Sequence, residues 1–259
     1  MTFISILPEW LCLIVTLIFV LLSQEVGYRF GTRRRLRPGD NPVEAAGTMA
    51  GTAIGLLAFM LAFTFNGAAS NHHARKDLVI EEANAVRTAY LQSMALPAPY
   101  RAGVRDLLRE YLDIRVNALQ FNKVELQKAL KRTATIQGEL WSVALALQQK
   151  ASDAPMVGPF TDSLQKIFDL HVQRFETALQ SHIHPIIWIV LYMLTFFAMA
   201  MIGYRIGLAG PRSAFVAISM AMAFSAILLL IVTLDRPIGM IKISQKPLAD
   251  VLTTLSADK

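Results

Sequence analysis

The clearest pattern along the chain is a set of long stretches that carry no charged residue. Three of them, residues 45–70, 185–204 and 213–234, are each at least as long as the roughly 20 residues with which a helix crosses a bilayer. A fourth, residues 10–23, is shorter but is extended by apolar residues on either side. The pattern predicts about four transmembrane helices.

The polar middle of the chain, residues 71–184, repeats apolar residues at helical rather than strand spacing. Such stripes are typical of amphipathic helices that bury one face against their neighbours. Four stripes are expected, and their members are Val79, Ala83, Val86, Tyr90 and Met94; Val104, Leu108, Tyr111 and Leu112; Leu126, Leu130, Leu140 and Trp141; and Phe160, Leu164, Ile167, Phe168, Val172, Phe175 and Leu179.

These patterns together predict an all-α integral membrane protein with a helical extramembrane domain inserted between the second and third spans. Residues 1–70 hold the first two spans and a basic connecting loop, and residues 71–184 form the inserted domain. Residues 185–234 form a transmembrane hairpin, and residues 235–259 form a short extramembrane tail. No internal repeat is expected.

The first apolar stretch has a competing interpretation as a cleaved secretory signal. Such a signal begins with basic residues and ends at a small-residue cleavage site. Here no Lys or Arg precedes the stretch, whereas Arg29, Arg33, Arg34, Arg35 and Arg37 follow it. That order of charges favours an uncleaved anchor.

The net charge of +6 does not indicate nucleic-acid binding, because most of the excess lies in this arginine cluster. Basic clusters beside a span ordinarily set topology or attract anionic lipid. The positive-inside rule favours the arginine cluster in the cytoplasm and the helical domain on the opposite side. The lipid bilayer is therefore an expected partner, and nucleic acid is not.

The second span carries the most informative face. Gly47, Gly51 and Gly55 recur every four residues, and Phe59 and Phe63 continue the same face. Within a membrane, glycines at this spacing let another backbone approach closely. Alternatively, several copies arranged around an axis would line a pore with this face, and the phenylalanines would form an apolar constriction.

Candidate chemistry elsewhere is sparse. His72, His73, His182 and His184 lie at one membrane surface, but no pair has the spacing of a helical chelate, so no metal site is expected. Glu81, Glu82 and Asn84 lie near Arg87 and are expected to pair with it or with another helix. Since enzyme motifs are absent, neither a catalytic activity nor a cofactor is expected.

Four segments together resemble the bacterial bestrophin-like family of membrane proteins. They are residues 55–65 (GLLAFMLAFTF), 82–91 (EANAVRTAYL), 234–239 (LDRPIG) and 246–248 (KPL). Asp235, Arg236, Pro237 and Gly239 form the tail motif of this resemblance.

The resemblance to true bestrophins is more remote, and it implies a pentameric anion channel with four helices per subunit. Its pore would be lined by the second span, with Gly51, Gly55, Phe59 and Phe63 facing the axis. The acidic calcium-binding run of bestrophins is replaced by residues 240–244 (MIKIS), so calcium activation is not expected. The resemblance also implies a cytoplasmic helical domain, opposite to the prediction from the charges.

The sequence therefore predicts a multi-pass, homo-oligomeric, channel-like protein of the bacterial plasma (inner) membrane that passes small ions such as chloride. The alternative is a non-conducting scaffold or sensor whose helical domain binds a partner. Fold class does not distinguish the two, because one fold supports many functions.

Overall fold

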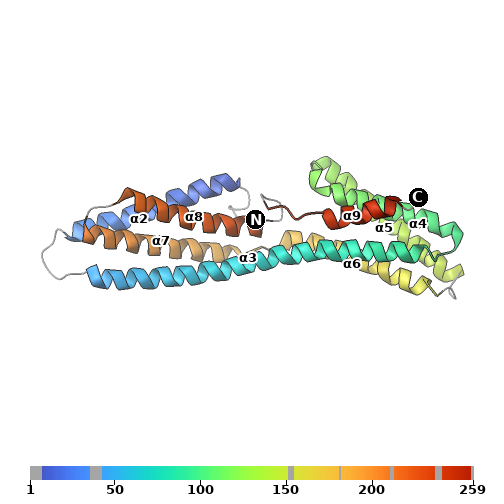
Figure 1. The fold of residues 1–259 in the computed structure, drawn as a ribbon, viewed down its shortest axis with the longest axis horizontal. Coiled ribbons are helices and arrows are strands. Elements are labelled where there is room, and N and C mark those ends of the chain that lie inside the picture. The colour runs from blue at the N-terminus through green and yellow to red at the C-terminus, as the bar shows by residue number, and fades with distance from the viewer. Residues whose placement is uncertain are drawn as a thin grey trace. The chain divides into compact units, whose positions relative to one another are not determined.

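The computed structural model describes residues 8–35, 43–150, 155–180, 182–210, 213–236 and 241–257, and every regular element in these ranges is a helix. The prediction of an all-helical protein is confirmed. The elements, shown in Figure 1, are α2 (Glu9–Arg35), α3 (Val43–Ser93), α4 (Ala98–Asn117), η1 (Ala118–Gln120), α5 (Lys123–Lys150), α6 (Val157–Gln180), α7 (Pro185–Ala209), α8 (Ala214–Asp235) and α9 (Lys246–Ala257).

The chain forms two compact units. The first comprises residues 1–72 and 181–242, and the second comprises residues 73–180 and 243–259. Among the described residues, four helices are long and apolar enough to cross a membrane, namely α2, α3, α7 and α8. The predicted number of candidate spans is confirmed.

The arginine cluster differs from its prediction as a loop. Helix α2 continues to Arg35, so Arg29, Arg33 and Arg34 lie in its last turns. Nothing in this stretch interrupts a helix, since arginine is a good helix former and a positive charge is favourable at a helix C-terminus.

Helices α2 and α7 cross with their backbones in direct contact. A methyl group placed on Gly203 would lie 2.0 Å from the Gln24 carbonyl oxygen, and one on Gly27 would lie 1.8 Å from that of Ala200. One placed on Gly31 would lie 2.2 Å from the Tyr204 carbonyl oxygen. Real side chains do not fit at such distances, so the crossing exists only because these positions are glycine. Close packing of this kind is how small residues join helices in lipid.

The crossing is built from one short motif used twice. Residues 27–31 read GYRFG and residues 203–207 read GYRIG, an offset of 176 positions. The contacts are reciprocal: Gly31 meets the carbonyl of Tyr204, and Gly207 meets the carbonyl of Tyr28 at 2.4 Å. The repeat differs from the expectation that the chain has none, because five residues are too few to stand out without the contact.

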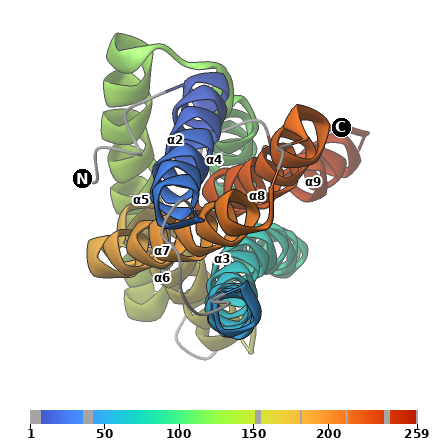
Figure 2. The ribbon, with the colours of Figure 1, turned by 90° about the vertical axis from the view of Figure 1, so that its left-hand side faces the viewer.

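The predicted close approach on the second span is not made by any residue that the structure describes. Outside the neighbouring turns of α3 itself, no described atom lies within 4 Å of a methyl group placed on Gly51 or Gly55, and Gly47 faces the Arg205 side chain. In both views of the first unit, α7 lies between α2 and α3 (Figures 1 and 2). The backbone-to-backbone contact therefore belongs to α2 and α7.

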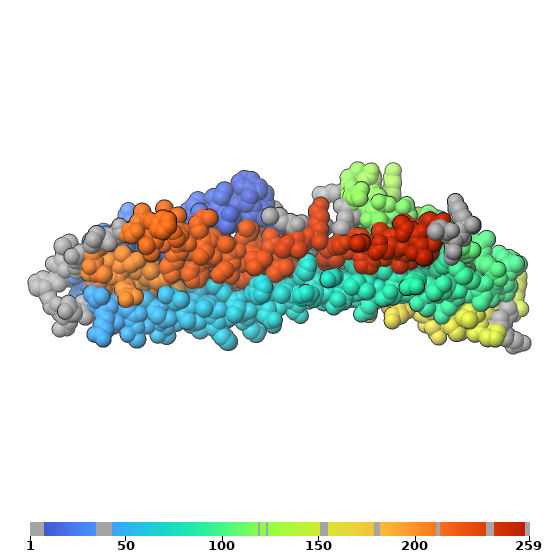
Figure 3. All heavy atoms as spheres, viewed as in Figure 1, coloured from blue at the N-terminus to red at the C-terminus, as the bar shows by residue number. Residues whose placement is uncertain are grey.

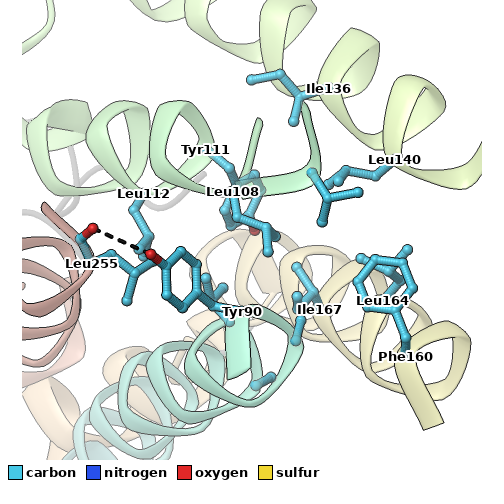
Figure 4. Packing of buried hydrophobic residues seen from close by; sticks show 14 of the residues in the cluster. Tyr90, Leu108, Tyr111, Leu112, Ile136, Leu140, Phe160, Leu164, Ile167 and Leu255 are labelled. Carbon is cyan, nitrogen blue, oxygen red and sulfur yellow. Dashed lines mark hydrogen bonds between the residues drawn. The ribbon is translucent and has the colours of Figure 1, made fainter. Parts of the chain in front are cut away.

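The second unit packs the polar half of α3 with α4, α5, α6 and α9 around one apolar core. Tyr90, Leu108, Tyr111, Leu140 and Phe160 are among its fully buried side chains (Figure 4). The predicted stripe on α4 is buried, and so is that on α3 apart from Met94, which is partly buried. The predictions for Leu126, Leu130, Val172 and Phe175 are wrong, because these side chains are exposed. The side chain of Leu179 lies outside the described part of the chain.

The tail ends in helix α9, which docks on α4. The Tyr90 hydroxyl donates to the Leu255 carbonyl over 3.4 Å (Figure 4), and Arg109 donates to the same oxygen over 2.7 and 3.0 Å. A cation at the last carbonyls of a helix satisfies acceptors that have no partner within that helix.

The α2–α7 contact predicts a strong effect of Gly203→Ala. The added methyl group meets backbone atoms that cannot rotate away, and overpacking of this kind costs about 1–3 kcal/mol. Thermal unfolding of the detergent-solubilised protein should show a clear drop in melting temperature. Gly138→Ala, where nothing lies within 4 Å, should leave it unchanged or slightly raised. Equal effects of the two substitutions would contradict the tight crossing.

Candidate pore-lining face and buried charge centre

One side of the membrane half of α3 packs on the rest of the first unit. Ala46, Ala50, Leu57, Leu61 and Ala68 are all buried. Their spacings of four and seven residues put them on a single helical stripe. This stripe fixes which side of α3 stays uncovered in one chain.

The uncovered side carries the predicted pore residues. Phe59 and Phe63 are 65% and 63% exposed, and Gly51 and Gly55 lie in open space. Figure 3 shows this part of α3 uncovered along its length. The structure thus brings the four predicted residues onto one free face, here called the glycine–phenylalanine face.

Oxygen atoms border the glycine end of this face. The Thr48 hydroxyl donates to the Glu44 carbonyl over 3.3 Å, and the Thr52 hydroxyl donates to the Thr48 carbonyl over 3.0 Å. Because each hydroxyl hydrogen is used within the helix, the exposed oxygens present lone pairs outward. Residues 43–70 contain no Lys or Arg and only one carboxylate, that of Glu44.

The tail motif joins the ends of three candidate spans. An oxygen of Asp235 accepts the Ile183 amide over 2.8 Å, just before α7 begins. Arg236 donates to the sulfur of Cys12 on α2 over 3.5 Å. Pro237 and Gly239 lie outside the described residues. The described half of the motif thus connects α8 to α7 and α2.

The histidines form no candidate metal centre in the described ranges. His184 caps the first turn of α7 by accepting the Ile186 amide, with Nδ1 and the nitrogen 3.4 Å apart. Across the residues that the structure describes, no group of three or more His, Cys, Asp or Glu side chains could hold a metal ion.

A buried charge centre lies in the second unit around Glu82 of α3. Its carboxylate is fully buried and accepts from Arg115 of α4 over 3.0 and 3.3 Å. Tyr111 of α4 and Arg174 of α6 donate to it as well. Arg174 also donates to Gln245, just before α9, over 3.1 Å. One carboxylate therefore ties together α3, α4 and α6 and, through Arg174, the start of α9.

Electrostatics keeps this carboxylate charged. Burial alone would raise the pKa of Glu82, but the guanidinium groups of Arg115 and Arg174 outweigh it, so the pKa lies below its usual value. Burial, together with the negative charge of Glu82, raises the pKa of the Tyr111 hydroxyl well above its usual value. The tyrosine therefore stays protonated and donates its hydrogen to Glu82.

Of the two pairings expected for Glu82, the one with other helices is found, since its partners Arg115 and Arg174 lie on α4 and α6. Arg87 and Glu81 are both exposed. The sequence did contain a signal. Arg115 lies four residues after Tyr111 on the apolar stripe of α4. A charged residue on such a stripe calls for a buried counter-charge, but periodicity does not say which helix supplies it.

Comparison with known protein families shows to which family the chain belongs. The family described as Bestrophin-like domain matches this chain over residues 14–248. The chain belongs to the bestrophin-like family. The resemblance noted in the sequence is thereby confirmed, although none of the curated proteins matches this bestrophin-like chain.

Solved structures resemble the bestrophin-like chain at low sequence identity. A crystallised membrane protein with a proline-to-alanine substitution shares 14% identity, with a TM-score of 0.62 and 96% of each chain covered. A bacterial bestrophin homologue from Klebsiella pneumoniae with a tryptophan-to-alanine substitution shares 16% identity, with a TM-score of 0.61 and 95% and 94% of the two chains covered. An isoleucine-to-threonine variant of that homologue shares 12% identity, with a TM-score of 0.61 and 96% of each chain covered. At these identities the likeness concerns the fold.

The charge centre predicts that Glu82→Gln strongly destabilises the protein. The substitution leaves Arg115 and Arg174 close together without a counter-charge, and losing one partner of a buried ion pair costs about 3–5 kcal/mol. Denaturant or thermal unfolding measures the effect. Glu81→Gln, one residue away but exposed, should stay within about 0.5 kcal/mol of the parent. Similar losses for both variants would contradict the role of Glu82.

His171 predicts a loss of stability in mild acid. Burial, with the nearby charge of Arg115, lowers the pKa of His171 below its usual 6.5, and its Nδ1 has no partner in the described part of the chain. As pH falls, His171 is therefore protonated in the unfolded state before it is protonated in the folded state. The contribution of neutral His171 to the free energy of unfolding is complete above pH 6.5 and is lost as pH falls through the folded pKa. Melting temperatures at pH 7.5 and 5.0 should differ less for His171→Gln than for the parent, while His182→Gln, an exposed control, should behave like the parent.

Proposed function

We propose that this bestrophin-like protein is a homo-oligomeric ion channel of the bacterial plasma (inner) membrane. Each chain crosses the membrane four times, through α2, α3, α7 and α8. The glycine–phenylalanine face of α3 lines the pore, and Phe59 and Phe63 form its narrowest part. The second unit is the helical extramembrane domain.

The observation that carries this proposal is the exposure of that face. Two large aromatic rings and two bare glycines lie uncovered on one side of α3, while the other side is buried. A single helix cannot enclose a pore, so conduction requires several copies around an axis. Family membership favours a ring, and the resemblance to true bestrophins implies five subunits.

Because the face changes from glycine to phenylalanine along its length, the pore narrows from the glycine end to the phenylalanine end. Glycines leave the pore wide, whereas a ring of phenyl groups makes a dry constriction that water and ions cross only at a cost. Such a constriction acts as a gate, since a small change in its radius changes whether water fills it.

The permeant ion has two candidates. The resemblance implies small anions such as chloride. The residues of α3 favour cations instead, because Glu44 and the lone pairs of Thr48 and Thr52 are acceptors. The exposed guanidinium of Arg205 on α7 lies against Gly47 at the same end and favours anions. The reversal potential across a KCl gradient separates the two, since its sign differs for anion and cation conduction.

A non-conducting scaffold or sensor is the second candidate function. Val172 and Phe175 are each 52% exposed on α6 of the second unit and would offer an apolar surface to a partner. Liposomes that show no flux at any potential or pH would favour this function over the channel.

The channel proposal predicts that replacing both Phe59 and Phe63 with alanine raises ion flux. Removing the rings widens the constriction, and lowering its barrier by about 1.4 kcal/mol would give roughly a tenfold increase. Flux is measured with purified protein in liposomes. The matched control is Phe215→Ala, because this phenylalanine is 79% exposed on α8, away from the glycine–phenylalanine face.

Two outcomes would count against the pore assignment. Equal changes in the alanine variants and the Phe215→Ala control would mean that the rings of α3 face lipid. A strictly monomeric mass in detergent and in chemical crosslinking would remove the shared pore.

The side on which the second unit lies is open to a direct experiment. Cys12 is the only cysteine, so a Cys12→Ser background with Gly138→Cys carries one exposed reactive thiol. Labelling of intact spheroplasts with an impermeant maleimide would place the unit outside, as the charge rule predicts. Labelling only after permeabilisation would place it in the cytoplasm, as the resemblance implies.

A further inference from the structure

An open hollow lies at one end of the first unit, between the first turns of α3 and the end of α7. Its volume is about 690 Å³, and it is lined by Val43, Glu44, Gly47, Thr48 and Arg205. The charge-free stretches begin at residue 45 in α3 and end at residue 204 in α7. The hollow therefore lies where both spans meet the membrane–water boundary.

Two opposite charges line this hollow without neutralising each other. Arg205 lies against α3, where its Nε would be 3.3 Å from a methyl group on Gly47. Within the described parts of the chain, neither Arg205 nor Glu44 makes an ion pair within 4.0 Å. Both side chains are exposed, so each can meet a counter-charge from outside the protein.

The repeated motif supplies an internal comparison for Arg205. Arg29 occupies the matching position in the first copy and forms an ion pair over 2.8 Å with Glu25, four residues earlier. The position four residues before Arg205 is Met201, which cannot pair with it. Arg29 is therefore neutralised on its own helix, whereas Arg205 presents its charge to the hollow.

We propose that this hollow binds the headgroup of a zwitterionic aminophospholipid, of the ethanolamine type. The guanidinium of Arg205 donates to the phosphate, for which its planar fork is well suited. The ammonium donates to the carboxylate of Glu44 and to the Thr48 hydroxyl oxygen, whose own hydrogen is already given to the Glu44 carbonyl. Gly47 lets the Arg205 side chain lie close to α3, since a methyl group there would be 3.3 Å from its Nε.

The charge pattern distinguishes this headgroup from its alternatives. Phosphatidylglycerol carries the phosphate without the ammonium, so Glu44 would repel it. The apolar surfaces of α3 and α7 continue from the hollow and can hold acyl chains. The site does not depend on ion conduction, so it would exist in a scaffold as well.

Native mass spectrometry of the detergent-purified full chain tests the proposal. The probes are a phosphatidylethanolamine, a phosphatidylglycerol with the same acyl chains, and soluble phosphoethanolamine. The parent should retain the ethanolamine lipid in preference to the glycerol lipid, and Arg205→Gln should lower this retention about tenfold. Glu44→Gln should abolish the preference, because the group that repels the anionic lipid and binds the ammonium is gone.

Arg29→Gln is the matched control, since it removes the same charge from the same motif outside the hollow. It should leave retention of the ethanolamine lipid unchanged. Equal losses for Arg29→Gln and Arg205→Gln, an unaltered lipid preference in Glu44→Gln, or preference of the parent for the glycerol lipid would each overturn the proposal. Competition by phosphoethanolamine at the lipid concentration would assign the site to a soluble compound instead. Unchanged melting temperatures confirm that the variants fold.

Discussion

The absence of four side chains is the constraint on which the membrane unit depends. At Gly27, Gly31, Gly203 and Gly207, helices α2 and α7 approach until carbonyl oxygens of one helix lie where side chains of the other would begin. In lipid there is no water to expel between helices, so dispersion and backbone contacts provide the attraction. Only a pair of very smooth surfaces gains enough contact to hold two long helices in one register.

The helical unit outside the apolar stretches is specified by a different interaction. Its core is ordinary in composition, yet one fully buried carboxylate lies within it and accepts hydrogen bonds from two helices. A buried charge of this kind adds little net stability over an apolar core, but it penalises every packing in which its partners are misplaced. Glu82 therefore selects one arrangement of α3, α4, α6 and the tail.

Much of this architecture could be read from hydrophobic periodicity. The four candidate spans, the helical stripes of α3 and α4 and the glycine–phenylalanine face of α3 follow from spacing alone. That this face is uncovered in one chain does not follow from spacing. Periodicity failed for Val172 and Phe175, which continue the stripe of α6 beyond the point at which partners cover it. It also did not identify the partners of Glu82 or the contact between the two GYRxG segments, because both depend on which helices become neighbours. Which helices become neighbours depends on tertiary packing. A single sequence carries only short signals of these pairings, and they are recognised once the structure is known.

The reciprocity of the α2–α7 crossing has a consequence for how its sequence can vary. Each glycine faces a carbonyl whose own neighbourhood contains another glycine of the set, so all four positions share one interhelical separation. A side chain at any one of the four positions would force the helices apart, and the other three positions would then no longer need to be glycine. The free-energy costs of substitutions within the set are therefore non-additive, and drift at these sites proceeds as one collective step rather than four independent ones.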